Sequence, residues 1–180
     1  MNRIAFLLFS LLPLAGFTLA GDTPAPRVDD LNQVIQDRFG NLTEADIHQG
    51  RFGVTRVARP ARRRVFVPVD EKERAPIVRL REEGWSASLY VLGLEGALTG
   101  PIRTSPEALP AAADRAEVLK LGKGALEKRA TLQGVLGEVR LEARPIPVSG
   151  KSCAGCHDPG LKEGDPLGAV IYVLRRTASP

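Results

Sequence analysis

The sequence predicts an α+β domain in which an antiparallel sheet is flanked by helices. Residues 85–93 and residues 132–143 alternate apolar and polar side chains with the two-residue period of a strand. Between them, Ser105-Pro106-Glu107 is a helix cap followed by a first-turn proline, and it predicts a helical region through about Arg129. No internal repeat is visible, so we expect one mixed domain.

The first predicted element is a short helix between Asp29-Asp30 and Gly40. Asp29-Asp30 can cap its amino end, and Gly40 is a typical stop. One stripe of this helix carries Leu31, Val34, Ile35 and Arg38. Such a stripe is typical of an amphipathic helix.

Two weaker signals follow. Thr43-x-x-Asp46 resembles a capping box and predicts a short turn that delivers His48. Residues 63–69 predict a strand. Pro68 assigns this strand to the edge of the sheet, because proline has no N–H to offer a neighbouring strand.

A clearer strand is predicted over residues 85–93. Trp85, Ala87, Leu89 and Val91 are expected on one face of the sheet, and Ser86, Ser88 and Tyr90 on the other. In the helical region that begins at Ser105, Gly122 and Gly124 weaken the middle. Two helices with a joint between them therefore remain an alternative to a single helix.

The last two predicted strands have contrasting patterns. Residues 132–143 predict one half-buried antiparallel strand, ended by Pro145 and Pro147. Its apolar side is Val135, Gly137, Val139, Leu141 and Ala143, and its polar side is Glu138, Arg140, Glu142 and Arg144. Residues 167–174 are almost continuously apolar, which predicts a central strand buried on both faces. We expect both strands in one antiparallel sheet, with a turn-rich loop between them.

That loop contains Cys153-Ala154-Gly155-Cys156-His157, which has the C-x-x-C-H pattern of c-type haem attachment. Two thiols at this spacing match the two vinyl groups of one haem and form thioethers with them. His157 then supplies the proximal iron ligand. The small residues Ala154 and Gly155 let the backbone lie close against the macrocycle. The pattern predicts one covalently bound haem c.

The amino end predicts export. Met1-Asn2-Arg3 is a short basic start, residues 4–14 are almost all apolar, and Thr18-Leu19-Ala20 ends the run with small residues. We expect residues 1–20 to be a secretory signal peptide, residues 21–27 a linker and residues 28–180 a single haem domain. An uncleaved anchor is the alternative, although the stretch is barely long enough to span a bilayer. No second apolar run follows, so we expect a periplasmic protein without a membrane span after signal removal.

A zinc site, a disulfide and a thioredoxin-like redox site are the alternatives to haem. An exported compartment is oxidising, so paired thiols close or are ligated to haem instead of remaining as thiolates for zinc. A thioredoxin-like pair lies early in a βαβ unit, whereas Cys153 stands late in this chain, with about one strand after it. The context therefore favours covalent haem.

The late position of the motif also argues against two common haem architectures. Small helical cytochromes carry C-x-x-C-H near the mature amino end, and four-helix haem proteins carry it on a last helix. Here the motif is late, and predicted strands flank it on both sides. A sheet-based haem domain fits this order better.

Three segments stand in a specific order near the carboxyl end: Arg144-Pro145-Ile146-Pro147, the motif at residues 153–157, and Gly164-Asp165-Pro166-Leu167-Gly168-Ala169-Val170. This order of strand, proline loop, haem motif, Gly-Asp loop and strand resembles the haem end of bacterial periplasmic single-haem c-type domains with a PAS-like fold. Those domains occur as free proteins and as sensory regions of signalling proteins. The resemblance covers roughly the last third of the chain. It implies a sheet with flanking helices that holds one haem in a redox or sensing role.

Few residues are candidates for the sixth iron ligand. The only methionine is Met1, which leaves with the signal peptide, and both cysteines are consumed by the thioethers. His48 is the one other histidine, so by elimination we expect it to be the distal ligand. Bis-His iron favours a low reduction potential. The alternatives are five-coordinate iron or ligation by Tyr, water or Lys, with Lys123 and Lys151 as unusual candidates.

Six arginines lie between Asp46 and Asp70 without an intervening acid: Arg51, Arg56, Arg59, Arg62, Arg63 and Arg64. A solvated basic face is the simplest interpretation. One or two of them could instead pair with haem propionates, since the planar guanidinium makes bidentate contacts. A docking patch for an acidic redox partner is the third interpretation.

These features predict an electron carrier and not an enzyme. The formal net charge of +4 falls to +3 without the leader, so bulk charge gives no case for a nucleic-acid partner. Six-coordinate iron binds no substrate, which favours electron transfer to a redox partner protein. The alternative is a haem-based redox or gas sensor that acts through a partner. A peroxidase fits less well, because with His48 on iron no imidazole remains as an acid–base group.

Overall fold

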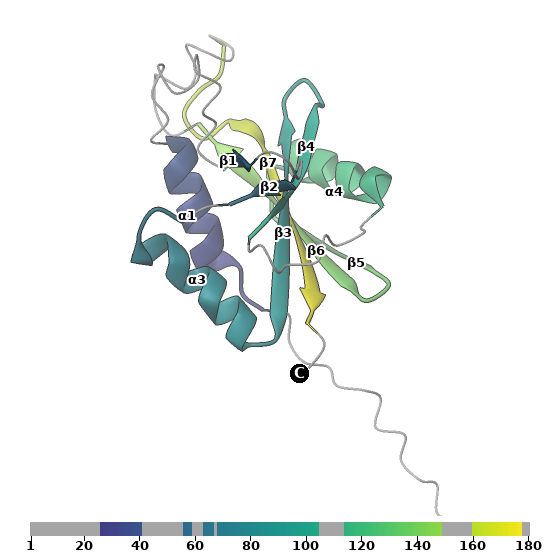
Figure 1. The fold of residues 1–180 in the computed structure, drawn as a ribbon. Helices are drawn as coiled ribbons and strands as arrows, with labels where there is room; N and C mark the ends of the chain where they lie inside the picture. The colour runs from purple at the N-terminus through teal and green to yellow at the C-terminus, as the bar shows by residue number, and fades with distance from the viewer. Residues whose placement is uncertain are drawn as a thin grey trace, which may run out of the picture.

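The computed structural model describes residues 26–40, 56–58, 63–66, 68–104, 114–148 and 160–177. These residues form an α+β fold, as predicted, with one sheet between two helical layers. Figure 1 shows α1 and α3 on one face of the sheet and α4 on the other. The elements are α1 (Asp29–Gly40), β1 (Arg56–Ala58), β2 (Arg63–Val65), α3 (Glu71–Glu82), β3 (Trp85–Gly93), β4 (Leu98–Arg103), α4 (Arg115–Lys128), β5 (Leu132–Leu136), β6 (Val139–Pro147) and β7 (Pro166–Arg176).

The strands lie in the order β1-β2-β4-β3-β7-β6-β5. The five strands from β4 to β5 are antiparallel throughout, and β2 pairs in parallel with β4. The first and last of these five strands along the chain, β3 and β7, are neighbours at the centre of the sheet. Because helices cover both faces, the sheet has a hydrophobic core on each side.

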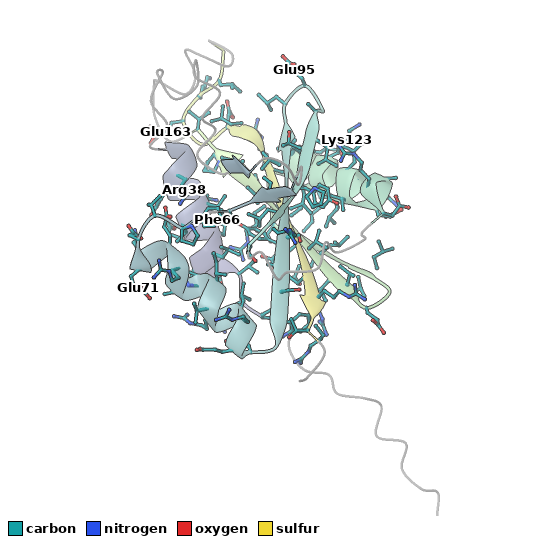
Figure 2. All side chains as sticks on the ribbon, viewed as in Figure 1. Arg38, Phe66, Glu71, Glu95, Lys123 and Glu163 are labelled. Carbon is teal, nitrogen blue, oxygen red and sulfur yellow. The ribbon has the colours of Figure 1, made fainter. Side chains whose placement is uncertain are left out.

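The predicted helix at the amino end is confirmed as α1. Leu31, Val34 and Ile35 are buried in the core between α1, α3 and the sheet. The fourth residue of the stripe, Arg38, lies over the ring of buried Phe66, with its guanidinium carbon 4.2 Å from the ring centroid (Figure 2). The Arg38 guanidinium also pairs with Glu73 of α3. The predicted turn at Thr43 lies outside the described residues.

Helix α3 and strand β4 were not predicted from the sequence. Asp70 caps α3 by accepting a hydrogen bond of 2.9 Å from the backbone N–H of Glu73, and the Glu73 carboxylate accepts one from Val69 N–H. The first bond satisfies an amide group that has no partner within the first turn of the helix, and the second ties the residue before the cap to that turn. Pro76 lies inside α3, where proline removes an intrahelical hydrogen bond, so the usual helix pattern is interrupted.

The edge strand predicted over residues 63–69 is only partly correct. Strand β2 ends at Val65, and it lies between β1 and β4 instead of at the edge. After the strand, the backbone N–H of Phe66 still donates to the carbonyl of Arg103 at 2.8 Å. Pro68 therefore lies beyond the strand and does not constrain its place in the sheet.

Helix α4 is a single helix without a joint. A Cβ atom at Gly122 would lie 3.0 Å from side-chain carbons of Leu92 and Ile171. The glycine therefore lets the helix lie close to the sheet and does not interrupt it. Asp114 caps the amino end of α4, and residues 105–113, where the helix was expected to begin, lie outside the described residues.

The single strand predicted over residues 132–143 is in fact a hairpin of β5 and β6. A two-residue turn at Gly137-Glu138, with φ of 59° at Gly137, sets Leu136 opposite Val139, so the buried face passes from even-numbered residues in β5 to odd-numbered residues in β6. Val135, which was predicted on the apolar side with Val139, therefore faces the other way and is 72% exposed. Pro145 does not end β6, which continues to Pro147. Both prolines follow Ala143, the last residue of β6 that pairs with β5, so their missing N–H groups leave no neighbour unsatisfied.

The remaining two strand predictions are confirmed. Strand β3 spans Trp85–Gly93, and its two faces enter the two cores, for example through Leu89 and Tyr90. Strand β7 is central, between β3 and β6, and its residues from Gly168 to Leu174 are buried. The two strands that flank the C-x-x-C-H loop, β6 and β7, are antiparallel neighbours, as predicted.

Candidate functional site

The two ends of the C-x-x-C-H loop are joined by backbone hydrogen bonds. Val148 N–H donates to the carbonyl of Asp165 at 2.8 Å, and Gly164 N–H donates to the carbonyl of Val148 at 3.1 Å. Val148 is buried. We call Val148, Gly164 and Asp165 the loop base. Residues 149–159, which include Cys153, Cys156 and His157, lie outside the described residues.

Asp165 holds the loop base with its side chain. Its carboxylate accepts a hydrogen bond of 2.9 Å from Lys162 N–H and another of 2.9 Å from the guanidinium of Arg129, which follows α4. The Lys162 N–H, and then the charge of Arg129, lower the pKa of Asp165. Gly164 has a φ of +86°, which side-chain-bearing residues rarely adopt. The Gly-Asp pair singled out in the sequence is thus a turn that closes the loop.

Gly168 lets β7 approach β3 closely just beyond the loop base. A Cβ atom at this position would lie 2.4 Å from the carbonyl oxygen of Leu92. Gly168 is paired with Gly93 across the two strands. No side chain fits at this position without a shift of the backbone, so Gly168 has a packing role.

The segment that contains His48 leaves the described part of the chain at the same end as the loop. In Figure 1, the carboxyl end of α1, the carboxyl end of β6 and the amino end of β7 lie together at one end of the molecule. Glu163 lies at that end in Figure 2. His48 itself is outside the described residues, eight positions after Gly40, so its contacts are not described.

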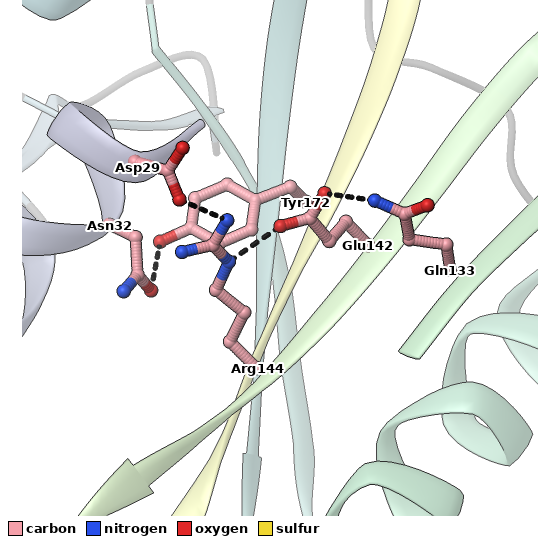
Figure 3. Close-up of polar contacts among 6 residues, drawn as sticks. All are labelled: Asp29, Asn32, Gln133, Glu142, Arg144 and Tyr172. Carbon is pink, nitrogen blue, oxygen red and sulfur yellow. Dashed lines mark hydrogen bonds and ion pairs between the residues drawn. The ribbon is translucent and has the colours of Figure 1, made fainter. Parts of the chain in front are cut away.

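A buried polar network links α1 to the strands on either side of the loop (Figure 3). The Tyr172 hydroxyl donates to Asn32 at 2.9 Å. Arg144 pairs with Glu142 at 2.5 Å and with Asp29 at 2.7 Å. Glu142 and Arg144 were predicted on the polar side of a half-buried strand. In the structure Glu142 is buried and Arg144 is nearly so, because α1 lies beside them.

Both tyrosines of the chain are described, and neither is suited to bind iron. Tyr172 is fully buried and Tyr90 is 4% exposed. Burial raises the pKa of each phenol. A tyrosine that ligates haem iron does so as an anion, which burial disfavours here. The tyrosine alternative for the sixth ligand is therefore weakened.

Of the other candidate residues, some lie in the part of the chain that the structure describes and others lie outside it. Lys123 lies on the exposed side of α4, on the face of the sheet opposite α1 (Figure 2). Lys151 lies outside the described residues. Of the arginine group, Arg56 begins β1 and Arg63 begins β2, but none of the six side chains is described. In the described residues, no three His, Cys, Asp or Glu side chains are placed to hold a metal ion, and no helix is long and apolar enough to cross a bilayer.

Comparison with known proteins gives no assignment: no family model, no curated protein and no solved structure matches this chain.

Proposed function

We propose that this protein is an exported monohaem c-type cytochrome that transfers electrons in the periplasm. The observation that carries the proposal is Cys153-Ala154-Gly155-Cys156-His157 behind an export leader. Cys153 and Cys156 bind one haem c through thioethers, and His157 is its proximal iron ligand. The redox partner is another protein, and nucleic acid is not a partner.

The frame around the motif supports a fixed haem. The loop begins and ends on β6 and β7, which pair with each other and lie between two hydrophobic cores. The bonds of the loop base hold the two ends of the loop together. A redox centre needs such a rigid support, because its distance to a partner sets the rate of electron transfer.

His48 is proposed as the distal ligand. Met1 is lost with the leader, the cysteines are used and both tyrosines are buried and neutral. The segment after Gly40 leaves α1 at the same end of the molecule as the haem loop (Figure 1). Eight residues of extended chain reach about 26 Å, which is most of the width of a small domain. Bis-His iron binds no substrate and favours a low potential, as an electron carrier requires.

A haem-based redox or gas sensor with a PAS-like fold is the second candidate. The ion pair between Asp165 and Arg129 favours the sensor. This contact joins the loop base to the end of α4, which lies on the face of the sheet opposite α1 and α3. A change in the loop could reach a partner on that face through this contact. The antiparallel sheet with flanking helices agrees with the PAS-like resemblance in fold class.

The first test is the mass of the exported protein. We expect the chain from Gly21 plus one haem, and we expect the haem to remain with the protein in acid–acetone extraction, because denaturation does not break thioethers. The matched control is Cys153→Ala with Cys156→Ala, which should yield the chain without covalent haem. A wild-type mass two protons below that of the free chain, without haem, would show a disulfide and refute the proposal.

A further inference from the structure

In the part of the chain that the structure describes, strand β5 is an edge of the sheet, and its sequence lacks the usual protection against pairing. Edge strands of soluble proteins commonly carry charges or prolines that prevent another strand from adding to them. Strand β5 has the sequence Leu132-Gln133-Gly134-Val135-Leu136, with neither. Val135 is 72% exposed. The opposite edge, β1, begins with Arg56, and Arg63 and Arg64 are in the strand beside it.

The backbone groups of β5 that do not bond to β6 are those of Gln133 and Val135. The β5–β6 hairpin closes with Leu136 opposite Val139 around a two-residue turn. In such a hairpin the closing pair is hydrogen-bonded, and the bonded pairs then alternate along the strands. The N–H and C=O groups of Gln133 and Val135 therefore point away from β6, toward the outside of the sheet.

We propose that β5 pairs with β5 of a second copy of this chain, antiparallel and with the twofold axis at Gly134. In this register Gln133 of each copy lies opposite Val135 of the other. The four outward N–H and C=O groups of each strand are then hydrogen-bonded. Leu132 of each copy then meets Leu136 of the other on the α4 face. The strand is complementary to itself in this register, and no like charges are opposed.

The face of β5 toward α4 gives the second copy an apolar surface to cover. A groove of about 740 Å³ lies between α4 and the β5–β6 hairpin, and its apolar lining includes Leu119, Leu121, Leu132 and Leu136, all partly buried. The antiparallel register brings the leucines of the second copy to the rim of this groove. A single chain leaves these leucines partly open to water, and burial of apolar area stabilises association.

The charges of α4 agree with the same axis. Leu121 lies against Gly134, and Gly124 lies against Leu132, so α4 runs antiparallel to β5. The twofold axis then directs the amino end of one α4 toward the carboxyl end of the other. The amino end carries Asp114, Arg115 and Glu117, and the carboxyl end carries Glu127, Lys128 and Arg129. Each end contains both signs, with Glu117 paired to Lys120 and Arg129 paired to Asp165, so the arrangement brings no cluster of like charges together.

The test is the oligomeric state of the mature haem-containing protein, measured by analytical ultracentrifugation over a concentration series. We expect a dimer, and we expect Val135→Lys to weaken it by roughly tenfold or more. Lysine on an edge strand opposes strand addition, and the proposed register places the two lysines diagonally across the new strand pair on one face. Val69→Lys is the matched control, because Val69 is also exposed, at 77%, but lies before α3. This control should leave the dimer unchanged. A wild type that is monomeric throughout, or a dimer that Val135→Lys does not weaken, overturns the proposal.

A second variant tests the register. In the proposed register Gly134 faces Gly134 of the second copy in a pair without hydrogen bonds. The Cα atoms of such an antiparallel pair are about 4.5 Å apart, which is within disulfide range. Gly134→Cys should therefore give a disulfide-linked dimer on a non-reducing gel, whereas Val135→Cys and Val69→Cys should not. Equal crosslinking of all three variants would show collision and overturn the register. The dimer does not depend on haem. The dimer can therefore be absent while the proposed function holds, and the proposed function can be wrong while the dimer forms.

Discussion

At the scale of single residues, the two glycines of the segment at residues 164–170 have different structural roles. Gly164 adopts a φ that favours glycine, and Gly168 removes a side chain from a crowded contact. The sequence presented both as members of one pattern. Only the structure separates a requirement of the backbone from a requirement of space.

Gly168→Ala should destabilise the protein by about 1–3 kcal/mol, because the added methyl group would overlap the carbonyl of Leu92 and force β7 away from β3. Urea unfolding, followed by circular dichroism, measures the change. Gly93→Ala is the control, since a Cβ there lies 3.9 Å from its nearest neighbour, the carbonyl of Ala97. Equal stability of the two variants would refute the packing role of Gly168.

At the scale of elements, the sequence predicted those whose hydrophobic period is uninterrupted. The alternation in β3 and the continuous apolar run in β7 were sufficient. Helix α3 was missed because Pro76 and its many charges obscure the helical period, although Asp70 and Glu73 mark its beginning. Strands β5 and β6 were predicted as one because Val135, Gly137 and Val139 continue a two-residue apolar period through the turn, although the buried face changes phase there.

The loop base depends on the charge of Asp165. The pKa of this carboxyl is lowered in the folded chain, so ionised Asp165 contributes stability above its unfolded pKa, and that contribution is lost as the pH falls through the folded pKa. Asp165→Asn should remove this acid-dependent step. It should also speed hydrogen exchange at the amides of Val148 and Gly164, because the turn loses its bond to Arg129.

Asp37→Asn is the matched control for Asp165→Asn. Asp37 is also a carboxylate with a lowered pKa, due first to its hydrogen bond with Lys72, but it lies on α1. We expect exchange at the loop base to be unchanged in this variant. Similar acceleration in both variants would mean that general destabilisation, and not the bond of Asp165, controls the loop.

At the scale of the whole molecule, the proposed haem site depends on segments far apart in the sequence. Its cysteines were found from five consecutive residues, because C-x-x-C-H is a local pattern. The partner ligand has no local pattern, so His48 was reached by elimination. The topology adds what a sequence cannot, namely that α1, β6 and β7 meet at one end (Figure 1).

His48→Ala distinguishes the electron carrier from the sensor. If His48 is the distal ligand, wild-type iron is six-coordinate and low-spin in both oxidation states, and reduced protein binds carbon monoxide slowly or not at all. The variant should become high-spin and bind carbon monoxide readily, with its covalent haem retained. Optical spectra of the reduced protein, with and without carbon monoxide, measure both effects. Lys123→Gln is the control and should resemble the wild type.

An unchanged spectrum in His48→Ala would exclude His48 from the iron. Wild-type protein that is already five-coordinate and takes up carbon monoxide would favour the sensor. Neither result bears on the proposed thioether attachment to Cys153 and Cys156, so ligation and attachment are tested separately.

The central position of β7 has a consequence for biogenesis. Of the described elements this strand comes last, yet β3 and β6 both pair with it, and it supplies side chains to both cores. The central pairs of the sheet therefore cannot form until the segment after residue 165 is available. If the chain is exported and takes up haem as proposed, the cysteines reach the outside before the strand that completes the sheet. Haem attachment would then precede closure of the fold, on a segment that is still accessible.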